Sequence, residues 1–462
     1  MFSMPCLRLR RLAAVALNLA LVSGCSTGRQ GAPPGEPIET SGPPLRAAEV
    51  GAATPSSDER ELEPGHVLER GAFVRQVLRN NPSLESARSG FRAALGRVRQ
   101  AGTFEDPMVE IGVAPLSVGA GAPFGYEVAI FQKLPWFGKR GLEEAAASAE
   151  AEAARADYEA VRRELALTAV TLYDQYFVTT RSLAINEQHV ALMQAMRAAA
   201  VAQFGTGRGS AQDAFQAEAE LTHLEHDAVM LATARDVTVA QMNELLHRAP
   251  ELPLPAPVAE LPLPAAPDGS SGRLQGEAVE RRPDIVSARE RARAQEARGE
   301  RAERDAYPDF TLSTGYNSMW EMPEHRFTVG VGFNVPLQSG RRGGAADEAR
   351  AMRSQFESEA ARLSDAARTQ VFVALKQLEE SGHVLALYEK RLLPVAEQQI
   401  DAARAGFSTA QNGFSAVIDA ERNLRRVELD YQSVRADYGV RRAVLDRALG
   451  RIPTLDWKEG LP

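Results

Sequence analysis

The sequence predicts an α+β fold in which one unit, a helix followed by a strand pair and a long helical hairpin, occurs twice. Two observations lead to this prediction. Residues 107–134 and 309–335 alternate apolar and polar side chains, which is typical of strands. Each stretch is followed by a long run of helix-forming residues, 139–203 and 344–405. The same order of features in both halves indicates a tandem duplication.

The N-terminus has the three parts of an export signal. Arginines precede an apolar stretch from Leu12 to Val22, and small residues then lead to Cys25. Because this apolar stretch is too short for a transmembrane helix, we predict a signal peptide at residues 1–24. Because it ends in cysteine, this segment resembles a lipoprotein signal, and the resemblance implies that Cys25 is acylated. Since Ser26 is the next residue, it also implies an outer-membrane location. An ordinary signal peptide with an incidental cysteine is the alternative.

Residues 25–63 are rich in Gly, Pro and Ser, so we expect a lipid anchor followed by a flexible tether. After Cys25 no apolar run is long enough for a transmembrane helix, and any membrane crossing must be made by strands.

Composition and motifs exclude several classes of protein. The net charge of −8 provides no basic field for nucleic acid. Cys6 and Cys25 are the only cysteines, which argues against a disulfide framework and against a CxxC metal or redox site. The sequence contains no P-loop, dinucleotide fingerprint or nucleophile elbow. We therefore expect neither an enzyme nor a cofactor.

The first unit is predicted at residues 64–249. Its initial helix is broken at Asn81-Pro82, because proline disfavours helix in the residue before it. Strands follow at 107–116 and 126–134, each close to the length that a tilted strand needs to cross a bilayer.

The helical hairpin of this unit begins with residues 139–203, which would extend roughly 100 Å as a helix. The chain then turns at 204–210 and returns over 211–247. Residues spaced by three and four predict a coiled-coil seam. They are Tyr158, Val161, Leu165, Thr168, Leu172 and Tyr176.

A proline-rich connector at 250–268 leads to the second unit, residues 269–451, and a C-terminal tail at 452–462. This unit has predicted strands at 309–317 and 326–335.

Its long helix, 344–405, contains Pro394, which should kink it. The turn is expected at 407–413. The predicted seam is Val371, Leu375, Leu378, Leu385, Tyr388, Leu392 and Val395.

Both kinds of element require more than one chain. Four strands cannot close into a barrel, and an open sheet edge in lipid leaves backbone groups unpaired. The apolar seams of the long helices likewise exceed what one hairpin can bury. The sequence therefore predicts an oligomer.

Several motifs distributed over residues 64–451 resemble the TolC-like outer membrane factor family. They are Asn81-Pro82-Ser83-Leu84, Arg282-Pro283-Asp284-Ile285, the junction from Gln132 to Arg140, Leu393-Pro394, and Ala448-Leu449-Gly450. The resemblance implies a homotrimer that forms a twelve-stranded β-barrel and a periplasmic α-helical tunnel. It also implies a periplasmic adaptor (membrane fusion) protein and an inner-membrane pump as partners. The junction is most similar to members that work with resistance-nodulation-division pumps.

The resemblance also suggests site residues. Asp213 and Asp419 follow the two hairpin turns, where acidic residues of the family ring the closed periplasmic entrance; exposed surface carboxylates are the competing interpretation. The turns themselves are expected to contact the adaptor. Their candidate residues, which ordinary tight turns would equally explain, are Gly205, Gly207, Gly209, Thr409 and Gly413.

Proline and glycine mark both places where a strand meets a long helix: Pro135 and Gly138, then Pro336 and Gly340. We expect the glycines to turn the chain and the basic pairs after them to lie just below the outer membrane. Trp136 is expected at the membrane interface, with core packing as the alternative.

His223 and His226 share a helix face, but the duplicated positions are not histidines. We therefore predict a solvated surface there rather than a metal site.

Together with the predicted strands and helices, the family resemblance implies a lipid-anchored, passive outer-membrane exit duct of a tripartite efflux system for drugs or metal ions. The alternatives are the exit duct of a type I protein secretion system and a periplasmic coiled-coil scaffold without a pore.

Overall fold

The computed structural model describes residues 65–115, 124–207, 209–409 and 411–454. All of them lie in one compact unit, Pro55–Pro462. The predicted signal peptide, Cys25 and the tether lie outside the described residues, as does most of the predicted C-terminal tail.

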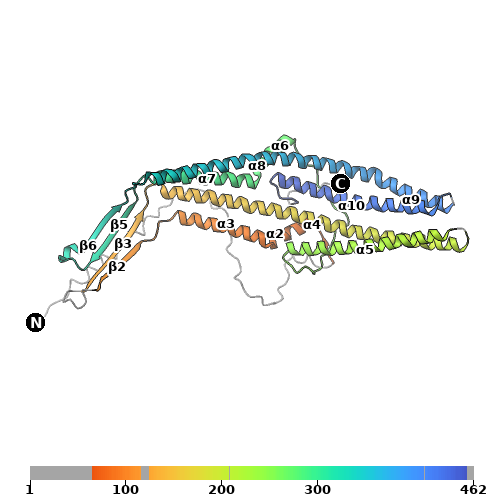
Figure 1. Cartoon of the computed structure of the whole chain (residues 1–462), viewed down its shortest axis with the longest axis horizontal. Helices are drawn as coiled ribbons and strands as arrows, with labels where there is room; N and C mark the ends of the chain where they lie inside the picture. The colour runs from red at the N-terminus through yellow and green to blue at the C-terminus, as the bar shows by residue number, and fades with distance from the viewer. Residues whose placement is uncertain (1–64, 116–123, 208, 410, 455–462) are drawn as a thin grey trace. The chain divides into compact units, whose positions relative to one another are not determined.

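The order of elements is the same in the two halves, as the sequence predicts (Figure 1). The first half contains β1 (Val67–Leu68), α2 (Arg70–Asn80), α3 (Pro82–Ala101), β2 (Met108–Ala114), β3 (Gly125–Leu134), α4 (Lys139–Gly205) and α5 (Ala211–Leu245). The second contains β4 (Ala256–Pro257), α6 (Ser271–Arg281), α7 (Pro283–Arg304), β5 (Phe310–Asn317), η3 (Pro323–His325), β6 (Phe327–Phe333), α8 (Ser339–Leu387), the π-helical turn η4 (Tyr388–Leu392), α9 (Leu393–Ser408) and α10 (Phe414–Ala448).

The break between α2 and α3 arises from local chemistry. Asn81 caps α3, since its Oδ1 accepts the Ser83 amide at 2.9 Å, and Pro82 occupies the first helical position, where its missing N–H costs nothing. The Asn81 amide also donates to the Leu245 carbonyl at 3.0 Å, so the break is tied to the end of α5.

Four strands form one antiparallel sheet in the order β2-β3-β5-β6. The register aligns Ile111 with Val128, Val128 with Tyr316, and Tyr316 with Phe327. Because side chains alternate along a strand, most apolar side chains of the four strands occupy the same face, with Met108 and Phe131 as exceptions. The opposite face contains Glu110, Glu127, Lys133, Thr311, Ser313 and Thr328.

The apolar side chains of the sheet are exposed on its surface and do not pack into a core. Ile111 and Val329 remain 70% and 69% exposed on the apolar face. Among the described strands, β2 and β6 each have a neighbour on one side only. The chain thus presents an unburied apolar face and two open edges.

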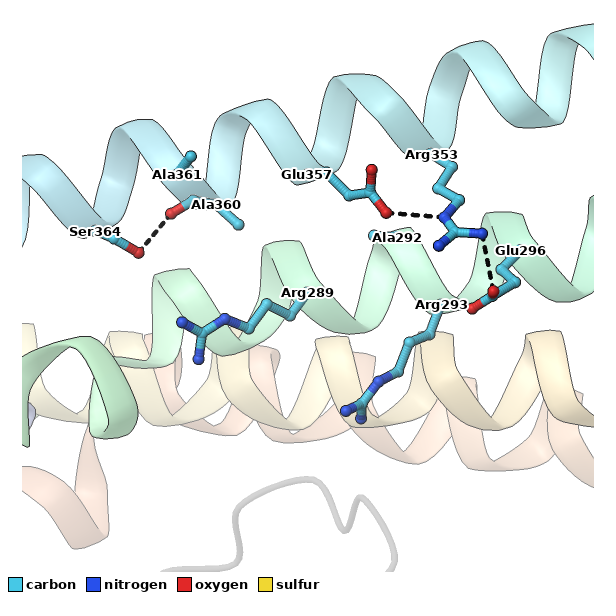
Figure 2. Close-up of a pocket in the computed structure, with 9 residues that line it drawn as sticks. All are labelled: Arg289, Ala292, Arg293, Glu296, Arg353, Glu357, Ala360, Ala361 and Ser364. Carbon is cyan, nitrogen blue, oxygen red and sulfur yellow. Dashed lines mark hydrogen bonds and ion pairs between the residues drawn. The ribbon is translucent and has the colours of Figure 1, made fainter.

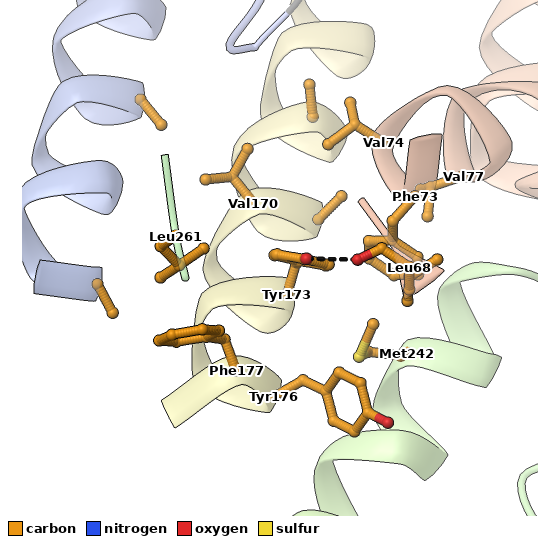
Figure 3. Packing of buried hydrophobic residues seen from close by; sticks show 14 of the residues in the cluster. Leu68, Phe73, Val74, Val77, Val170, Tyr173, Tyr176, Phe177, Met242 and Leu261 are labelled. Carbon is orange, nitrogen blue, oxygen red and sulfur yellow. Dashed lines mark hydrogen bonds between the residues drawn. The ribbon is translucent and has the colours of Figure 1, made fainter. Parts of the chain in front are cut away.

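The helices provide the buried core, and one cluster joins both halves of the chain (Figure 3). Tyr173 of α4 is fully buried, and its hydroxyl donates to the Leu68 carbonyl at 2.6 Å. The connector between the two halves also packs: β4 pairs in parallel with β1, and Leu261 is fully buried.

The seam predicted for α4 is confirmed only in part, because Tyr176 is buried and Leu165 and Leu172 pack against the same core. Thr168 is exposed, while the buried face includes Ala166, Ala169, Val170 and Tyr173. Alanine adds little hydrophobicity and so gives a weak signal in the sequence, yet these small side chains allow neighbouring helices to approach closely. α4 packs against α3, α5, α7 and α10, so its buried residues do not follow a single two-helix seam.

The chain accommodates Pro394 with the π-helical turn η4, directly before α9. Proline lacks an N–H and clashes with the carbonyl four residues earlier, and a π turn relieves both problems. The turn inserts about one residue into the helical register. The predicted seam residue Val395 is consequently 60% exposed, and its neighbour Ala396 is buried instead.

Within the described ranges, no helix combines the length and the apolar composition needed to span a membrane.

Candidate functional site

The turn between α4 and α5 requires two of its glycines for conformational reasons. Gly207 has a left-handed φ of +72°, and the Gly209 amide donates to the Gln203 carbonyl at 3.2 Å. A Cβ on Gly209 would lie 3.0 Å from the Gln203 Cβ. Gly205, at the end of α4, has open space around it. Turn geometry therefore explains why glycine occupies positions 207 and 209, but it does not explain the glycine at position 205.

The second turn is built differently. Thr409 follows α9, and its hydroxyl donates to the Ala405 carbonyl at 3.1 Å. Gly413 is the N-cap of α10 and has an ordinary negative φ. The next residue, Phe414, is buried and packs edge-on against Phe407, with ring centroids 5.3 Å apart. An adaptor contact at either turn stays a prediction.

Asp213 has a structural role that the sequence analysis did not assign. It forms a capping box with Ser210, whose amide donates to Asp213 Oδ2 at 3.2 Å. Asp419 is exposed on α10, and no hydrogen bond or ion pair to it occurs among the described residues. The structure does not bring the two carboxylates into contact within one chain, so a common role as gate residues stays a prediction.

A buried ionic centre joins α4 to α10. His189 Nδ1 lies 2.6 Å from Glu421 Oε1, and its Nε2 lies 2.8 Å from Glu428 Oε2. Glu421 is fully buried. Only a protonated imidazole can donate from both nitrogens. Burial alone would lower the pKa of His189, but the two glutamates outweigh it and raise the pKa to about 9.

A second set of charges connects α5 to α10 beside this centre. Buried Glu220 accepts from Arg422 Nε at 2.7 Å, and Asp227 accepts from Arg425 at 2.8 Å. The Arg425 guanidinium also donates to Asn186 Oδ1 at 3.4 Å, one turn before His189. Together these residues, which we call the α10 ionic centre, fasten α10 to both helices of the first hairpin.

The α10 ionic centre is not predicted from the sequence. Glu421 and Glu428 are seven residues apart, so they share one helix face, and this was a readable signal. The sequence gives no signal that His189, 232 positions from Glu421 along the chain, lies beside it.

The strand–helix junction holds a buried lysine. Lys139 is only 3% exposed, and its Nζ donates to Asp309 Oδ1 at 2.9 Å and to the Tyr307 carbonyl at 3.0 Å. Burial would raise the pKa of Asp309, but hydrogen bonds from Lys139 and the Trp136 amide hold it below its usual range. Lys139 therefore ties α4 to the start of β5. The location of this basic pair just below the outer membrane stays a prediction.

Two further expectations about the junction differ in outcome. Trp136 stacks on Tyr307 at 5.2 Å and on Phe310 at 5.7 Å between ring centroids, so local packing holds its ring. Gly138 turns the chain with a left-handed φ of +84°. Gly340 does not, because it lies inside α8 without a positive φ. The two copies enter their long helices by different geometries.

A groove of about 410 Å³ lies between α7 and α8 (Figure 2). Arg353 of α8 bridges Glu296 of α7 and Glu357 of its own helix, each at 2.8 Å. These charges join the two helices across an open, polar surface.

His223 and His226 are both exposed on α5. In the described part of the chain no group of three or more His, Cys, Asp or Glu residues is arranged to hold a metal ion.

Comparisons with known proteins agree with this architecture. Residues 274–451 match the family described as outer membrane efflux protein. The cobalt-zinc-cadmium resistance protein CzcC of Cupriavidus metallidurans is 29% identical over 238 residues, which cover 51% of this chain and 54% of that protein. The chain thus matches about half the length of that relative.

Solved structures show the same fold. A crystal structure of CusC, described in terms of folding and transmembrane channel formation, has a TM-score of 0.70 at 19% identity; the match covers 83% of this chain and 92% of that one. The outer membrane protein VceC of Vibrio cholerae gives 0.68 at 18% identity, covering 83% and 96%. The second of the two duplicated halves, residues 274–451, is thus similar to the outer membrane efflux protein family, and the chain as a whole shares the fold of these solved structures.

Proposed function

We propose that this protein is the passive outer-membrane exit duct of a tripartite efflux system, assembled from three copies of the chain. The observation that supports this most is the four-stranded sheet, most of whose apolar residues share one exposed face and whose outer strands, β2 and β6, leave open edges. In a membrane such edges must be paired, and pairing β6 of one copy with β2 of the next closes a ring. Three copies would supply the twelve strands that the family resemblance implies.

The polar face of the sheet then lines the lumen, and the apolar face contacts lipid. The helical hairpins continue the duct into the periplasm, where their turns are the proposed contacts for an adaptor protein linked to an inner-membrane pump. Asp213 and Asp419 are proposed gate residues near this entrance, and acylated Cys25 is the proposed anchor. A ring of carboxylates at a narrow mouth would favour cations.

The name of the relative CzcC supports divalent metal ions as cargo. We place them ahead of drugs, and both are transported substrates rather than resident cofactors. The pump, not the duct, is expected to select between them.

Reconstitution into planar bilayers tests this proposal. The purified protein should migrate as a heat-modifiable trimer and give discrete single-channel currents with cation preference. A monomer without conductance would instead identify a periplasmic scaffold. A channel that functions only together with a type I secretion pump would favour the protein-secretion alternative.

A further inference from the structure

A cavity of about 650 Å³ lies at the junction between the sheet and α4. Its walls are largely apolar and aromatic. They include Phe104, Leu134, Trp136, Phe137, Phe310, Leu312 and Val331. Phe137 is 84% exposed beside Trp136 and leaves the cavity open at its side.

The cavity is continuous with the apolar face of the sheet. The register places Leu134 opposite Phe310, and Leu312 opposite Val331, on the face that also contains Ile111. If that face contacts lipid, as the proposed function requires, the cavity opens toward the acyl chains at the end of the strands nearest the long helices. Most of the cavity's strand residues come from β3 and β5, in the middle of the sheet, and Val331 comes from the edge strand β6.

The positively charged side chain of Arg140 lines this cavity. The Arg140 guanidinium lies 4.0 Å from the centre of the Phe104 ring. Within the described ranges no carboxylate pairs with it, whereas neighbouring Lys139 is engaged with Asp309. An arginine held over an aromatic ring beside an apolar cavity matches a ligand that has both a hydrocarbon chain and an anionic head.

We propose that this cavity binds one acyl chain of an anionic phospholipid of the surrounding bilayer, with the headgroup phosphate paired to Arg140. The proposal rests on the membrane-spanning sheet of the proposed function. It adds a defined lipid site at each chain, where the barrel strands meet the helices.

Tryptophan fluorescence provides the test, because Trp136 lines the cavity. The chain contains three tryptophans, so Trp320→Phe and Trp457→Phe leave Trp136 as the sole reporter. The full-length protein is reconstituted in vesicles containing lipids with brominated acyl chains, which quench tryptophan on contact. The brominated lipid is either phosphatidylglycerol, which is anionic, or phosphatidylcholine, which has no net charge.

Phosphatidylglycerol should be preferred at Trp136 by about fivefold, the equivalent of the roughly 1 kcal/mol that one arginine contributes near anionic lipid. Arg140→Gln should abolish this preference. Arg341→Gln is the matched control, because Arg341 occupies the corresponding junction of the second copy without lining the cavity, and it should change nothing.

A second variant tests occupancy independently of charge. Gly141 lines the cavity, and a Cβ there would meet open space. Since leucine is also a better helix former than glycine, Gly141→Leu should fold and fill the cavity. Quenching of Trp136 by both brominated lipids should then fall by half or more.

Equal quenching by the two lipids in the parent protein, or an unchanged preference in Arg140→Gln, would overturn the proposal. So would quenching that appears only after Cys25→Ser, since the cavity would then hold the chain's own anchor. Trimer stability and conductance are measured on the same preparations. A parent protein that forms a conducting trimer but shows no lipid preference refutes the lipid site alone. A parent protein that forms no trimer and gives no conductance refutes the proposed function.

Discussion

His189 of α4 contacts Glu421 and Glu428 of α10 at the same time, with one imidazole nitrogen 2.6 Å from the first carboxylate and the other 2.8 Å from the second. Since a neutral imidazole has only one N–H, this geometry holds a charged side chain in a buried position. The packing of α10 on the first hairpin should therefore depend on the protonation of a single residue.

The stability contributed by His189 should decline as the pH rises. The pKa of His189 is raised to about 9 in the folded chain, from an ordinary value of 6.5. The contribution is therefore fully present below about pH 6.5 and is lost as the pH rises through about 9. His189→Gln should be less stable than the parent by roughly 1.5–3 kcal/mol in mildly acidic buffer. Thermal denaturation at several pH values should show this difference shrinking toward alkaline pH.

His223→Gln serves as the control, because the His223 imidazole is exposed. It should leave the pH profile unchanged. A His189→Gln deficit that stays constant from acidic to alkaline pH would show that the imidazole acts by shape and not by charge.

The two junction glycines should respond oppositely to alanine. Gly138 has a left-handed φ, and a Cβ there would displace the Arg304 guanidinium. Gly138→Ala should cost about 1–2 kcal/mol of unfolding free energy. Gly340 lies in α8 with open space around it, so Gly340→Ala should be neutral or stabilise by up to about 1 kcal/mol. Denaturant unfolding of both variants measures this, and equal costs would contradict the geometric distinction.

Asp213 and Asp419 can be separated as gate and cap residues. Asp213→Gln preserves a capping box without the charge. Asp213→Ala removes the cap and should lower the unfolding free energy by about 1 kcal/mol. If Asp213 acts by charge at the entrance, both variants should reduce cation preference in single-channel recordings. Asp419→Asn should do the same without loss of stability, since this side chain is exposed. Unchanged ion selectivity in all three variants would leave Asp213 as a helix cap only.

The buried pair of Arg70 and Asp174 should be a strong constraint on the core. Arg70 Nε donates to Asp174 Oδ1 at 2.7 Å, and the two side chains are 5% and 1% exposed. Arg70→Met leaves a buried carboxylate without this partner and should cost roughly 3–5 kcal/mol. Arg70→Met combined with Asp174→Leu should recover much of that loss. Arg353→Met, which breaks exposed ion pairs, should destabilise the protein far less than Arg70→Met.

The strand patterns show how far sequence reasoning reaches. Alternation at 107–116 and 326–335 located the outer strands β2 and β6, and it also indicated which side chains share a face on each strand. It did not determine the register between β3 and β5, which come from different halves of the chain. That register, with Val128 opposite Tyr316, makes the four apolar faces into one.

The helices show the corresponding limit. Composition located α4 and the position of its turn, but the predicted seam missed the face around Ala166 and Ala169. Alanine is a weak hydrophobic signal in a sequence, whereas in a packed bundle its small size decides how near two helices can lie. Val395 was misplaced because a π turn cannot be read from spacing alone.

The sequence by itself thus determined the duplication, the strand pairs, the long hairpins and the proline and glycine breaks, because these depend on local conformational preference and periodicity. Only the tertiary structure revealed the centre around His189, the buried Lys139 and the cavity beside Arg140. Each of these brings together residues from segments distant in the chain, and the energy of a buried charge depends on neighbours that no local pattern specifies.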